Sequence, residues 1–308
     1  MHMAQVTPAD SGTQMTRARR VLVIYNPAAG QWRRRRLQAT LDELEELGCL
    51  ITLHKTTHRG DAEAKAQSLT LEDCDVVVAA GGDGTINEVA NGLINASGDV
   101  PPLAIIPLGT ANVQAQEIGL RGQPTAIAEA IATGPLMQAH LGHANGRHFI
   151  MMAGVGFDAH VVSNVDLALK RTTGKLAYVI ETLAQALHYG FPACRVTIDG
   201  RNFEACSVVV CNGRHYGGPF IAAPHADLTQ PTFEVCLLEK GGWLHVLRYG
   251  LALTMGRLHS LPDVRIESGR SIRIEGEVGL PVQADGDIIA ELPVDIGVSD
   301  KTLTLVIP

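Results

Sequence analysis

The chain lacks a long apolar run, and no stretch of about 18 consecutive apolar residues occurs within its 308 residues. Because a helix that crosses a membrane needs about 20 such residues, the sequence predicts no membrane span. Residues 1–18 are polar and become basic toward their end. They contain no apolar targeting segment, so we expect a disordered tail on a cytoplasmic protein.

The sequence also lacks closely spaced cysteine pairs and an excess of basic residues. The six cysteines form no C-x-x-C pair, and most lie in apolar runs such as 207–211, which indicates reduced, buried thiols. Lys and Arg total 25 against 32 Asp and Glu, a net charge of -7. General nucleic-acid binding needs a basic face, so we expect no nucleic-acid partner.

Several familiar nucleotide and metal motifs are absent or incomplete. The P-loop string G-x-x-x-x-G-K-[ST] and the protein-kinase strings H-R-D and D-F-G do not occur. Residues 154–159 imitate a dinucleotide fingerprint, but they lie outside an evident βαβ unit and no acidic partner follows at the required distance, so we reject an NAD site. His54 and His58 lie near a predicted strand end without a third ligand, so no metal site is expected there.

The length and the hydrophobic content of 46% predict two globular domains. In the first half, short apolar strands alternate with helices of amphipathic spacing, which predicts a doubly wound α/β domain over residues 19–140. The expected strands are 21–25, 50–54, 75–79 and 103–106, and the expected helices are 32–47, 61–69, 85–94 and 111–118.

In the second half, strands follow one another and are separated by turn residues, which predicts a β-rich substrate domain over residues 141–308. The last strand can return to the first domain. The expected strands are 136–143, 147–152, 194–198, 203–211, 232–238, 271–275, 280–284 and 288–291. Helices are expected at about 174–189 and 243–259. The apolar stripe of helix 174–189 indicates core packing, with lipid contact as an alternative.

The strongest chemical signal is the run GGDGTINE at residues 81–88. It follows the apolar strand 75–79 and precedes a helix, which places it at the carboxyl edge of the sheet, where open α/β folds bind ligands. Glycines allow the backbone to approach phosphates, and a helix N-terminus offers free N–H groups. Asp83 is then expected to face Mg²⁺ on the nucleotide, because this hard ion prefers oxygen ligands.

Two further loops follow strands at the same edge, NPAAG at 26–30 and PLGTAN at 107–112. Each is weak alone, but three glycine-containing loops at one sheet edge favour a phosphate or adenosine site. Thr56, four residues before Gly60, is expected to be a fourth contributor. The four arginines at 33–36 are either a solvated helical turn or a group that steers anions toward these loops.

The series N-P-x-x-G, G-G-D-G-T-x-N-E and P-L-G-T-x-N resembles the diacylglycerol kinase catalytic family, which includes bacterial lipid kinases and sphingosine kinases. The stretches 154–159 (GVGFDA), 174–178 (GKLAY), 212–218 (NGRHYGG) and 285–287 (DGD) are similar to later motifs of that family. The resemblance implies an ATP-binding α/β domain, a β-sandwich lipid-binding domain, and catalysis in the cleft between them.

By this resemblance, the chain would bind ATP and Mg²⁺ and phosphorylate a hydroxyl of a diacylglycerol-like or sphingoid lipid at the inner membrane face. Mg²⁺ would be held by Asp83. The residues implied to contact ATP are Asn26, Pro27, Ala28, Ala29, Gly30, Thr56, Gly81, Gly82, Asp83, Gly84, Thr85, Ile86, Asn87, Gly109 and Thr110.

The acidic turn of Asp285 and Asp287 would supply the catalytic base in this comparison. From the residues alone, two carboxylates around a glycine also fit an ordinary hairpin turn, although phosphorylation of a hydroxyl needs a group that accepts its proton. The sequence does not rank the two carboxylates. It also does not identify the lipid or indicate an oligomeric state.

The sequence departs from the family pattern at two positions and leaves two alternative functions open. Val113 follows the third loop, where the family often has Asp. Gln230 replaces an acidic residue of a turn that binds a structural Mg²⁺ in many bacterial members, so we expect no tightly held metal there. The alternatives are an NAD kinase-like enzyme, which shares the G-G-D-G-T string, and a non-catalytic nucleotide or lipid sensor. Retention of Asp83 and Asp285 argues against the sensor.

Overall fold

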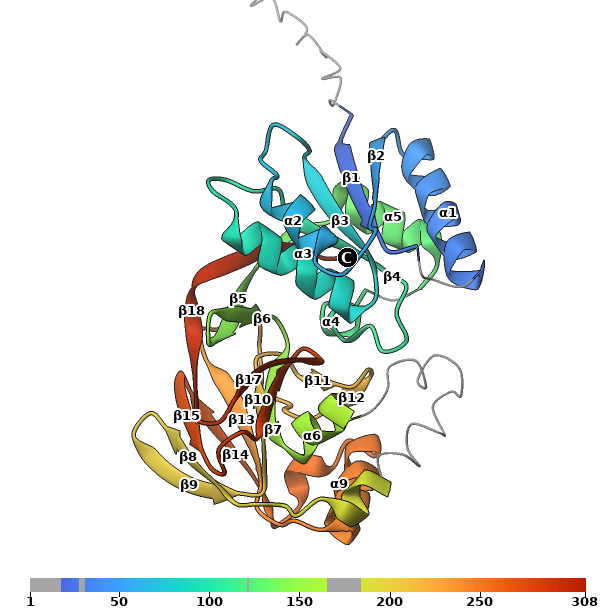
Figure 1. Ribbon diagram of the computed structural model, residues 1–308. Coiled ribbons are helices and arrows are strands. Elements are labelled where there is room, and N and C mark those ends of the chain that lie inside the picture. Colours follow the sequence, from blue (N-terminus) through green and yellow to red (C-terminus); the bar gives the residue numbers. More distant parts are fainter. Residues whose placement is uncertain (1–17, 28–30, 121, 165–183) are drawn as a thin grey trace, which may run out of the picture.

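The computed structural model describes residues 18–27, 31–120, 122–164 and 184–308. They form two lobes, with an α/β domain in the upper part of Figure 1 and a β-rich domain below it. The predicted fold class is confirmed. The expected tail at 1–18 falls almost wholly outside the described residues, as does most of the helix expected at 174–189.

The first domain is built on four parallel strands in the order β2-β1-β3-β4. Every residue of β3 and β4 is buried, as expected for a parallel sheet covered on both faces. The strands are β1 (Arg20–Tyr25), β2 (Leu50–Lys55), β3 (Val76–Gly81) and β4 (Leu103–Pro107). The helices are α1 (Gln31–Glu46), α2 (Asp61–Gln67), α3 (Asp83–Asn95), α4 (Val113–Glu117) and α5 (Pro124–Thr133).

Helix α5 was not predicted, although its first residue, Pro124, is a helix-start signal. Its buried side chains Ile127, Ala128 and Ile131 follow helical spacing. The alanine-rich sequence between them gave little hydrophobic contrast, so the period was hard to recognise. The helix packs beside α1 on the first sheet.

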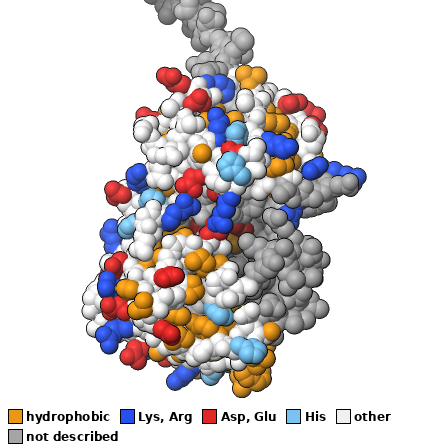
Figure 2. Space-filling view, viewed as in Figure 1, with side chains coloured by type: hydrophobic (Ala, Val, Ile, Leu, Met, Phe, Trp, Pro, Cys, Tyr) orange, Lys and Arg blue, Asp and Glu red, His pale blue; other side chains and the backbone are white. Residues whose placement is uncertain are grey.

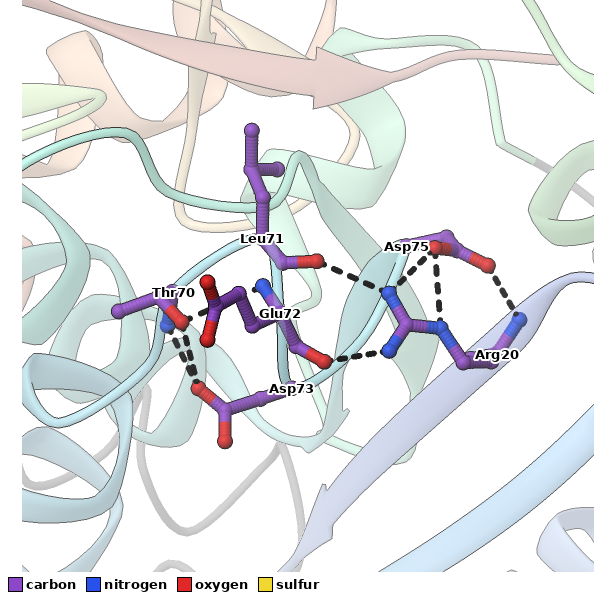
Figure 3. Close-up of polar contacts among 6 residues, drawn as sticks. All are labelled: Arg20, Thr70, Leu71, Glu72, Asp73 and Asp75. Carbon is purple, nitrogen blue, oxygen red and sulfur yellow. Dashed lines mark hydrogen bonds and ion pairs between the residues drawn. The ribbon is translucent and has the colours of Figure 1, made fainter.

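The amino edge of this sheet is fixed by a polar network around Arg20 (Figure 3). Its guanidinium donates to Asp75 Oδ1 at 2.7 and 3.1 Å and to the Leu71 carbonyl at 2.9 Å, and it also bonds to the Glu72 carbonyl. Thr70 donates to Asp73 from its N–H and its hydroxyl, each at 2.9 Å. These bonds tie the turn before β3 to the start of β1, at the edge opposite the glycine-containing loops.

The second domain has a six-stranded sheet in the order β14-β13-β10-β7-β16-β17. It packs on β8, β9 and β15, which belong to the sheet that continues from the first domain. The hydrophobic core between them includes Phe149 and Phe233. The bounds are β7 (Met152–Gly156), β8 (Cys194–Ile198), β9 (Arg201–Ala205), β10 (Ser207–Cys211), β13 (Phe233–Leu238), β14 (Val264–Gly269), β15 (Ser271–Glu275), β16 (Pro281–Ala284) and β17 (Asp287–Glu291). Short β11 (His215–Tyr216) pairs with β12 (Phe220–Ile221).

A long final strand joins the two domains. β18 (Val294–Val306) pairs with β5 (Leu136–Ala144) along most of its length, with β15 near its start and with β4 near its end. It extends the first sheet into the second domain, as Figure 1 shows. The chain therefore returns to its first domain at its end. Neither β18 nor β14 was among the strands expected from the sequence.

Three expected elements are divided in the structure. The strand expected at 147–152 is β6 (Arg147–Phe149) and β7, because the amides between them bond to a side chain and not to a neighbouring strand. The strand expected at 203–211 is β9 and β10, which lie in different sheets. The helix expected at 243–259 is α9 (Trp243–Thr254) and a short 3-10 turn, separated at Gly256, whose φ of +67° ends the helix.

Two further sequence expectations concern cysteine and the membrane. All six cysteines are free, and five of them are buried. Over the part of the chain that the structure describes, no helix has the length and apolar character required to cross a membrane.

Candidate functional site

The second and third glycine loops touch at the carboxyl edge of the first sheet. The Leu108 N–H donates to the Gly81 carbonyl at 2.8 Å. A Cβ added at Gly109 would lie 2.7 Å from Gly82 Cα, and one at Gly81 would lie 2.5 Å from Thr85 Cβ. These distances leave no room for a side chain. Gly109 therefore lets the two loop backbones meet, and Gly81 leaves space for the Thr85 side chain of its own motif.

Asp83 fixes the third loop to the second. Its carboxylate accepts the N–H groups of Asn112 at 3.0 Å and Val113 at 2.6 Å, at the start of α4. Burial raises the pKa of Asp83, and the amide donors, which include that of Gln114, act against this rise. Helix α3 begins at Asp83, two residues earlier than expected. Asp83 therefore caps a helix that lies 30 residues away in sequence, a contact that the sequence did not predict.

The first loop and Thr56 lie beside these two loops. The Asn26 N–H donates to the Ala80 carbonyl at 3.2 Å, and Thr56 donates to the Tyr25 carbonyl from its N–H at 3.0 Å and its hydroxyl at 3.3 Å. These bonds join the loops after β1, β2 and β3. The predictions for Ala28, Ala29 and Gly30 fall outside the described residues.

Two of the four arginines contact the loops. Arg33 Nη2 donates to Thr110 Oγ1 at 3.1 Å, and Arg34 Nη2 reaches the Pro27 carbonyl at 3.4 Å. Helix α1 thereby places positive charge against the first and third loops. This geometry favours the interpretation in which the arginines attract anions, although neither side chain is buried.

Ile86 and Asn87 do not line the open edge. Their side chains are 0% and 3% exposed, and Asn87 Oδ1 accepts Asn91 Nδ2 at 2.9 Å. Asn91 in turn bonds to the backbone of His148 in β6, at 3.1 and 3.2 Å. This end of the motif therefore ties α3 to β6, and the side chains of Ile86 and Asn87 are packed inside the protein. Their expected contact with ATP stays a prediction.

The acidic turn contains one strongly held carboxylate. Asp285 has a φ of +47°, and its carboxylate accepts the N–H groups of Ile150 at 2.7 Å and of Met151 and Met152 at 3.0 Å each. Burial raises the pKa of Asp285 to about 6 despite these donors, and the negative charge of Asp83 adds to the rise. An acidic group of the first domain thus acts electrostatically on one of the second.

Asp287 has a different environment. It pairs with Arg59 at 2.8 Å, and Arg59 lies in the loop between β2 and α2, next to the first-domain edge. The Asp287 side chain is partly exposed. The structure therefore distinguishes the two carboxylates, which the sequence left unranked, since one is held by backbone amides and the other pairs with an exposed arginine.

Asp158 was not predicted as a site residue, yet it adjoins the acidic turn. Its carboxylate accepts the Tyr216 hydroxyl, and it accepts Gln283 Nε2 at 2.7 Å. Gln283 Oε1 then accepts the Gly286 N–H at 2.9 Å. Burial raises the pKa of Asp158. Two motifs noted in the sequence, at 154–159 and 212–218, thus meet, although their contact had no sequence signal.

The position of Asp158 also explains the glycine spacing at residues 154–159, which imitates a dinucleotide fingerprint. A Cβ at Gly154 would lie 2.0 Å from Asp158 Oδ2, and one at Gly156 would lie 2.6 Å from the Cys206 carbonyl. These glycines admit a carboxylate and a neighbouring strand, so their spacing reflects packing and not a dinucleotide site.

The 212–218 motif joins the two domains. Glu117 of α4 accepts the His215 N–H at 3.0 Å, His215 Nδ1 at 2.6 Å and Arg214 Nε at 3.2 Å. Asn212 donates to the carbonyls of His140 and Ile150 at 2.8 and 2.7 Å. Because α4 is also capped by Asp83, these bonds connect the third loop to the second domain.

The turn at 227–230 was the other possible metal site. Asp227 Oδ1 accepts the N–H and the hydroxyl of Thr229 at 2.9 and 2.8 Å, within its own turn. No group of three or more His, Cys, Asp or Glu side chains placed to hold a metal occurs among residues 18–27, 31–120, 122–164 and 184–308. The expectation for Gln230 stays a prediction.

Two family models match the chain. The first, described as the diacylglycerol kinase catalytic domain, matches residues 20–144. The second, described as the YegS C-terminal NAD kinase beta sandwich-like domain, matches residues 151–307. The boundary between the two matches falls at β6, where the structure passes from the first domain to the second.

The chain is also similar to individual proteins along most of its length. It is 28% identical over 279 residues to a diacylglycerol kinase of Bacillus subtilis, covering 89% of this chain and 92% of the relative. The same identity holds over 278 residues of a diacylglycerol kinase of Staphylococcus aureus. The crystal structure of a diacylglycerol kinase from Bacillus anthracis superposes with a TM-score of 0.77 at 26% identity, covering 95% of this chain and 98% of that one.

Proposed function

We propose, from the premise that this chain belongs to the diacylglycerol kinase catalytic family of lipid kinases, that it transfers the γ-phosphate of ATP to a hydroxyl of a diacylglycerol-like or sphingoid lipid. The observation that carries the proposal is the buried Asp285 carboxylate, which three backbone amides hold in one orientation. Burial, with a contribution from the charge of Asp83 in the other domain, raises the pKa of this carboxyl to about 6. A base that is ionised at neutral pH and adjoins a phosphate-binding edge suits this reaction.

ATP is proposed to bind along the edge formed by Asn26, Thr56, Gly82 and Gly109. Backbone N–H groups and the N-terminus of α3 would receive its phosphates. Arg33 and Arg34 would balance part of their charge. The close backbone contact between the second and third loops keeps side chains away from this edge.

Mg²⁺ is proposed to accompany ATP, with Asp83 as its protein ligand. The donor set fits in type, because Mg²⁺ prefers oxygen ligands and Asp83 supplies a carboxylate, which also accepts the amides of Asn112 and Val113. When bound, the ion would neutralise phosphate charge. Asp83 would also keep α4 and the third loop in place through its amide contacts, whether or not the ion is present.

Asp285 is proposed as the base. The lipid hydroxyl oxygen forms a bond to the γ-phosphorus while the bond between that phosphorus and the bridging oxygen of ADP breaks, and the hydroxyl proton passes to Asp285. The amides of Ile150, Met151 and Met152 fix the orientation of this carboxylate. Asp287 would position Arg59, and with it the loop that contains Thr56.

The test is release of ADP from ATP with three acceptors in parallel: dioctanoylglycerol, extracted bacterial lipid and NAD. Lipid-dependent turnover that requires Mg²⁺, with a phosphorylated lipid recovered from the organic phase, is the expected result. Turnover with NAD alone would support an NAD kinase-like enzyme. ATP binding without turnover on any acceptor would support a sensor, and either outcome would overturn the lipid kinase proposal.

A further inference from the structure

Helix α9 exposes a continuous apolar face. Leu244, Leu247, Leu251 and Met255 follow one another at spacings of three, four and four residues, and their side chains are 60%, 39%, 55% and 65% exposed. This spacing places them on one side of the helix, while Tyr249 and Ala252 are buried on the other. Leucines exposed singly are common, but a row of them on one helix usually marks a binding surface.

Over the sequence of α9 and its flanks the charged residues are basic, and the acidic residues that border this segment, Glu239 and Asp263, are each paired with an arginine. Residues 240–262 contain no Asp or Glu, although the whole chain has a net charge of -7. Lys240 and Arg257 are exposed at the two ends of the helix, and Arg248 pairs with Asp263, which lies just beyond this segment. An apolar face with cations at its borders complements a bilayer that contains anionic lipid.

The buried side of α9 contacts residues that adjoin the candidate active site. Val246 packs against a small apolar cluster that contains Phe157 and Phe191, whose rings are stacked at 5.5 Å between centroids. Phe157 directly precedes Asp158, which connects through Gln283 to the acidic turn. Figure 2 shows hydrophobic side chains gathered at the lower end of the molecule, where Figure 1 places α9.

We propose that α9 is a docking surface for an anionic lipid bilayer. Its leucines and Met255 enter the boundary between headgroups and acyl chains, and Lys240 and Arg257 lie among the anionic headgroups. The choice of a bilayer as partner rests on the proposed function, since the substrate of a lipid kinase lies in a membrane. Docking here would bring the Phe157 cluster, and behind it the acidic turn, toward the lipid.

The test is flotation of the full chain with vesicles of phosphatidylcholine alone and of phosphatidylcholine mixed with phosphatidylglycerol. We expect the protein to float with the mixed vesicles. The double variant Leu244→Asp/Leu251→Asp should lose at least about tenfold in its bound-to-free ratio, because it removes two leucines from the apolar boundary. Leu71→Asp, at a similarly exposed leucine of the first domain, is the matched control and should float as the wild type does.

The contribution of Lys240 and Arg257 to vesicle binding is tested separately. Lys240→Gln/Arg257→Gln should reduce binding to mixed vesicles and leave the weak binding to phosphatidylcholine unchanged. Failure of the wild type to float, or equal flotation of the α9 variant, would overturn the proposal. A wild-type dimer in sedimentation velocity that the leucine variant converts to a monomer would assign the face to a second copy of the chain.

Flotation requires no catalysis, so it tests the docking surface even if no lipid is phosphorylated. If lipid is phosphorylated, the leucine variant should keep its turnover on monomeric dioctanoylglycerol and lose turnover on long-chain lipid in vesicles. Equal losses on both substrates would show that α9 supports the active site and not membrane docking.

Discussion

The nucleotide edge of the first domain and the acidic turn of the second are constructed differently. The edge depends on backbone contacts between glycine loops and on a cap between residues about 30 positions apart. At the turn, Asp285 is held by amides 133 to 135 positions away. The edge can therefore form when one domain folds, whereas the base acquires its environment only when the strand that follows β6 is paired.

The largest expected effect comes from the base. Asp285→Asn keeps the size of the side chain but removes its ability to take a proton, so kcat should fall by roughly 10² to 10⁴-fold. The KM for ATP should change little, because the proposed nucleotide site lies in the other domain. Steady-state kinetics with a competent lipid is the measurement.

Asp295→Asn is the matched control, because Asp295 is an exposed carboxylate of the same domain that pairs with Arg273. It should leave kcat unchanged. If Asp285→Asn also keeps a near-normal kcat while Asp287→Asn does not, the roles of the two carboxylates are reversed. If both keep it, the turn is structural.

Added side-chain volume should impair the glycine-containing edge, whereas loss of a carboxylate charge should impair the acidic turn. Gly109→Ala would place a methyl group 2.7 Å from Gly82 Cα and 2.6 Å from Asn112 Oδ1, so the two loops must separate. Overpacking of this kind costs about 1–3 kcal/mol, and the KM for ATP should rise by roughly ten- to a hundredfold. Isothermal titration with a non-hydrolysable ATP analogue measures the same change in binding.

Gly84→Ala is the control for this substitution. Gly84 lies in the same motif, in the first turn of α3, and an added Cβ there meets nothing within 4 Å. The variant should unfold at the same temperature as the wild type or higher, because alanine favours a helix. Equal destabilisation by the two alanines would show that the loops do not need close contact.

Asp83 lies at the edge of the first domain, and its charge acts on Asp285 in the acidic turn. Its substitution therefore tests whether the two regions are coupled. Asp83→Asn keeps one acceptor oxygen and leaves a backbone amide of α4 without its partner, at a cost of about 1–3 kcal/mol, so the KM for ATP should rise by roughly five- to 150-fold. Because the Asp83 charge raises the pKa of Asp285, the midpoint of the pH–rate profile should also move to lower pH. A profile that does not move would separate the two sites.

The pH dependence of the wild type should show opposite signs for activity and stability. Asp285 must be ionised to act, so kcat/KM should fall as pH drops through about 6. Its folded pKa exceeds the ordinary value of 3.8, so its contribution to stability is present below that value and is lost as pH rises through about 6. Rate profiles and urea unfolding at several pH values check the two signs.

The smallest effect is expected at the ion pair between Arg59 and Asp287. Arg59 is 76% exposed, and exposed pairs contribute about 0–1 kcal/mol. A double-mutant cycle of Arg59→Gln and Asp287→Asn, followed by urea unfolding, should give a coupling energy below about 1 kcal/mol. A larger value would mean that this pair contributes substantially to holding the turn against the first domain.

The sequence predicted local features well. The four parallel strands, the position of GGDGTINE at the sheet edge and the acidic turn were all recognised, because hydrophobic period and glycine placement act over a few residues. Boundaries were less accurate where a helix end depends on a distant group. The early start of α3 is an example, since Asp83 is a helical residue whose carboxylate is already occupied by α4.

By itself the sequence determined the fold class and the three glycine loops, since each depends on residues that adjoin in the chain. Only the tertiary structure decided the roles of individual side chains. It buried Ile86 and Asn87, placed Asp158 beside the acidic turn, and gave Asp285 its raised pKa. The physical reason is that burial and Coulomb interactions depend on distance in space, and the partners of these side chains lie far from them in sequence.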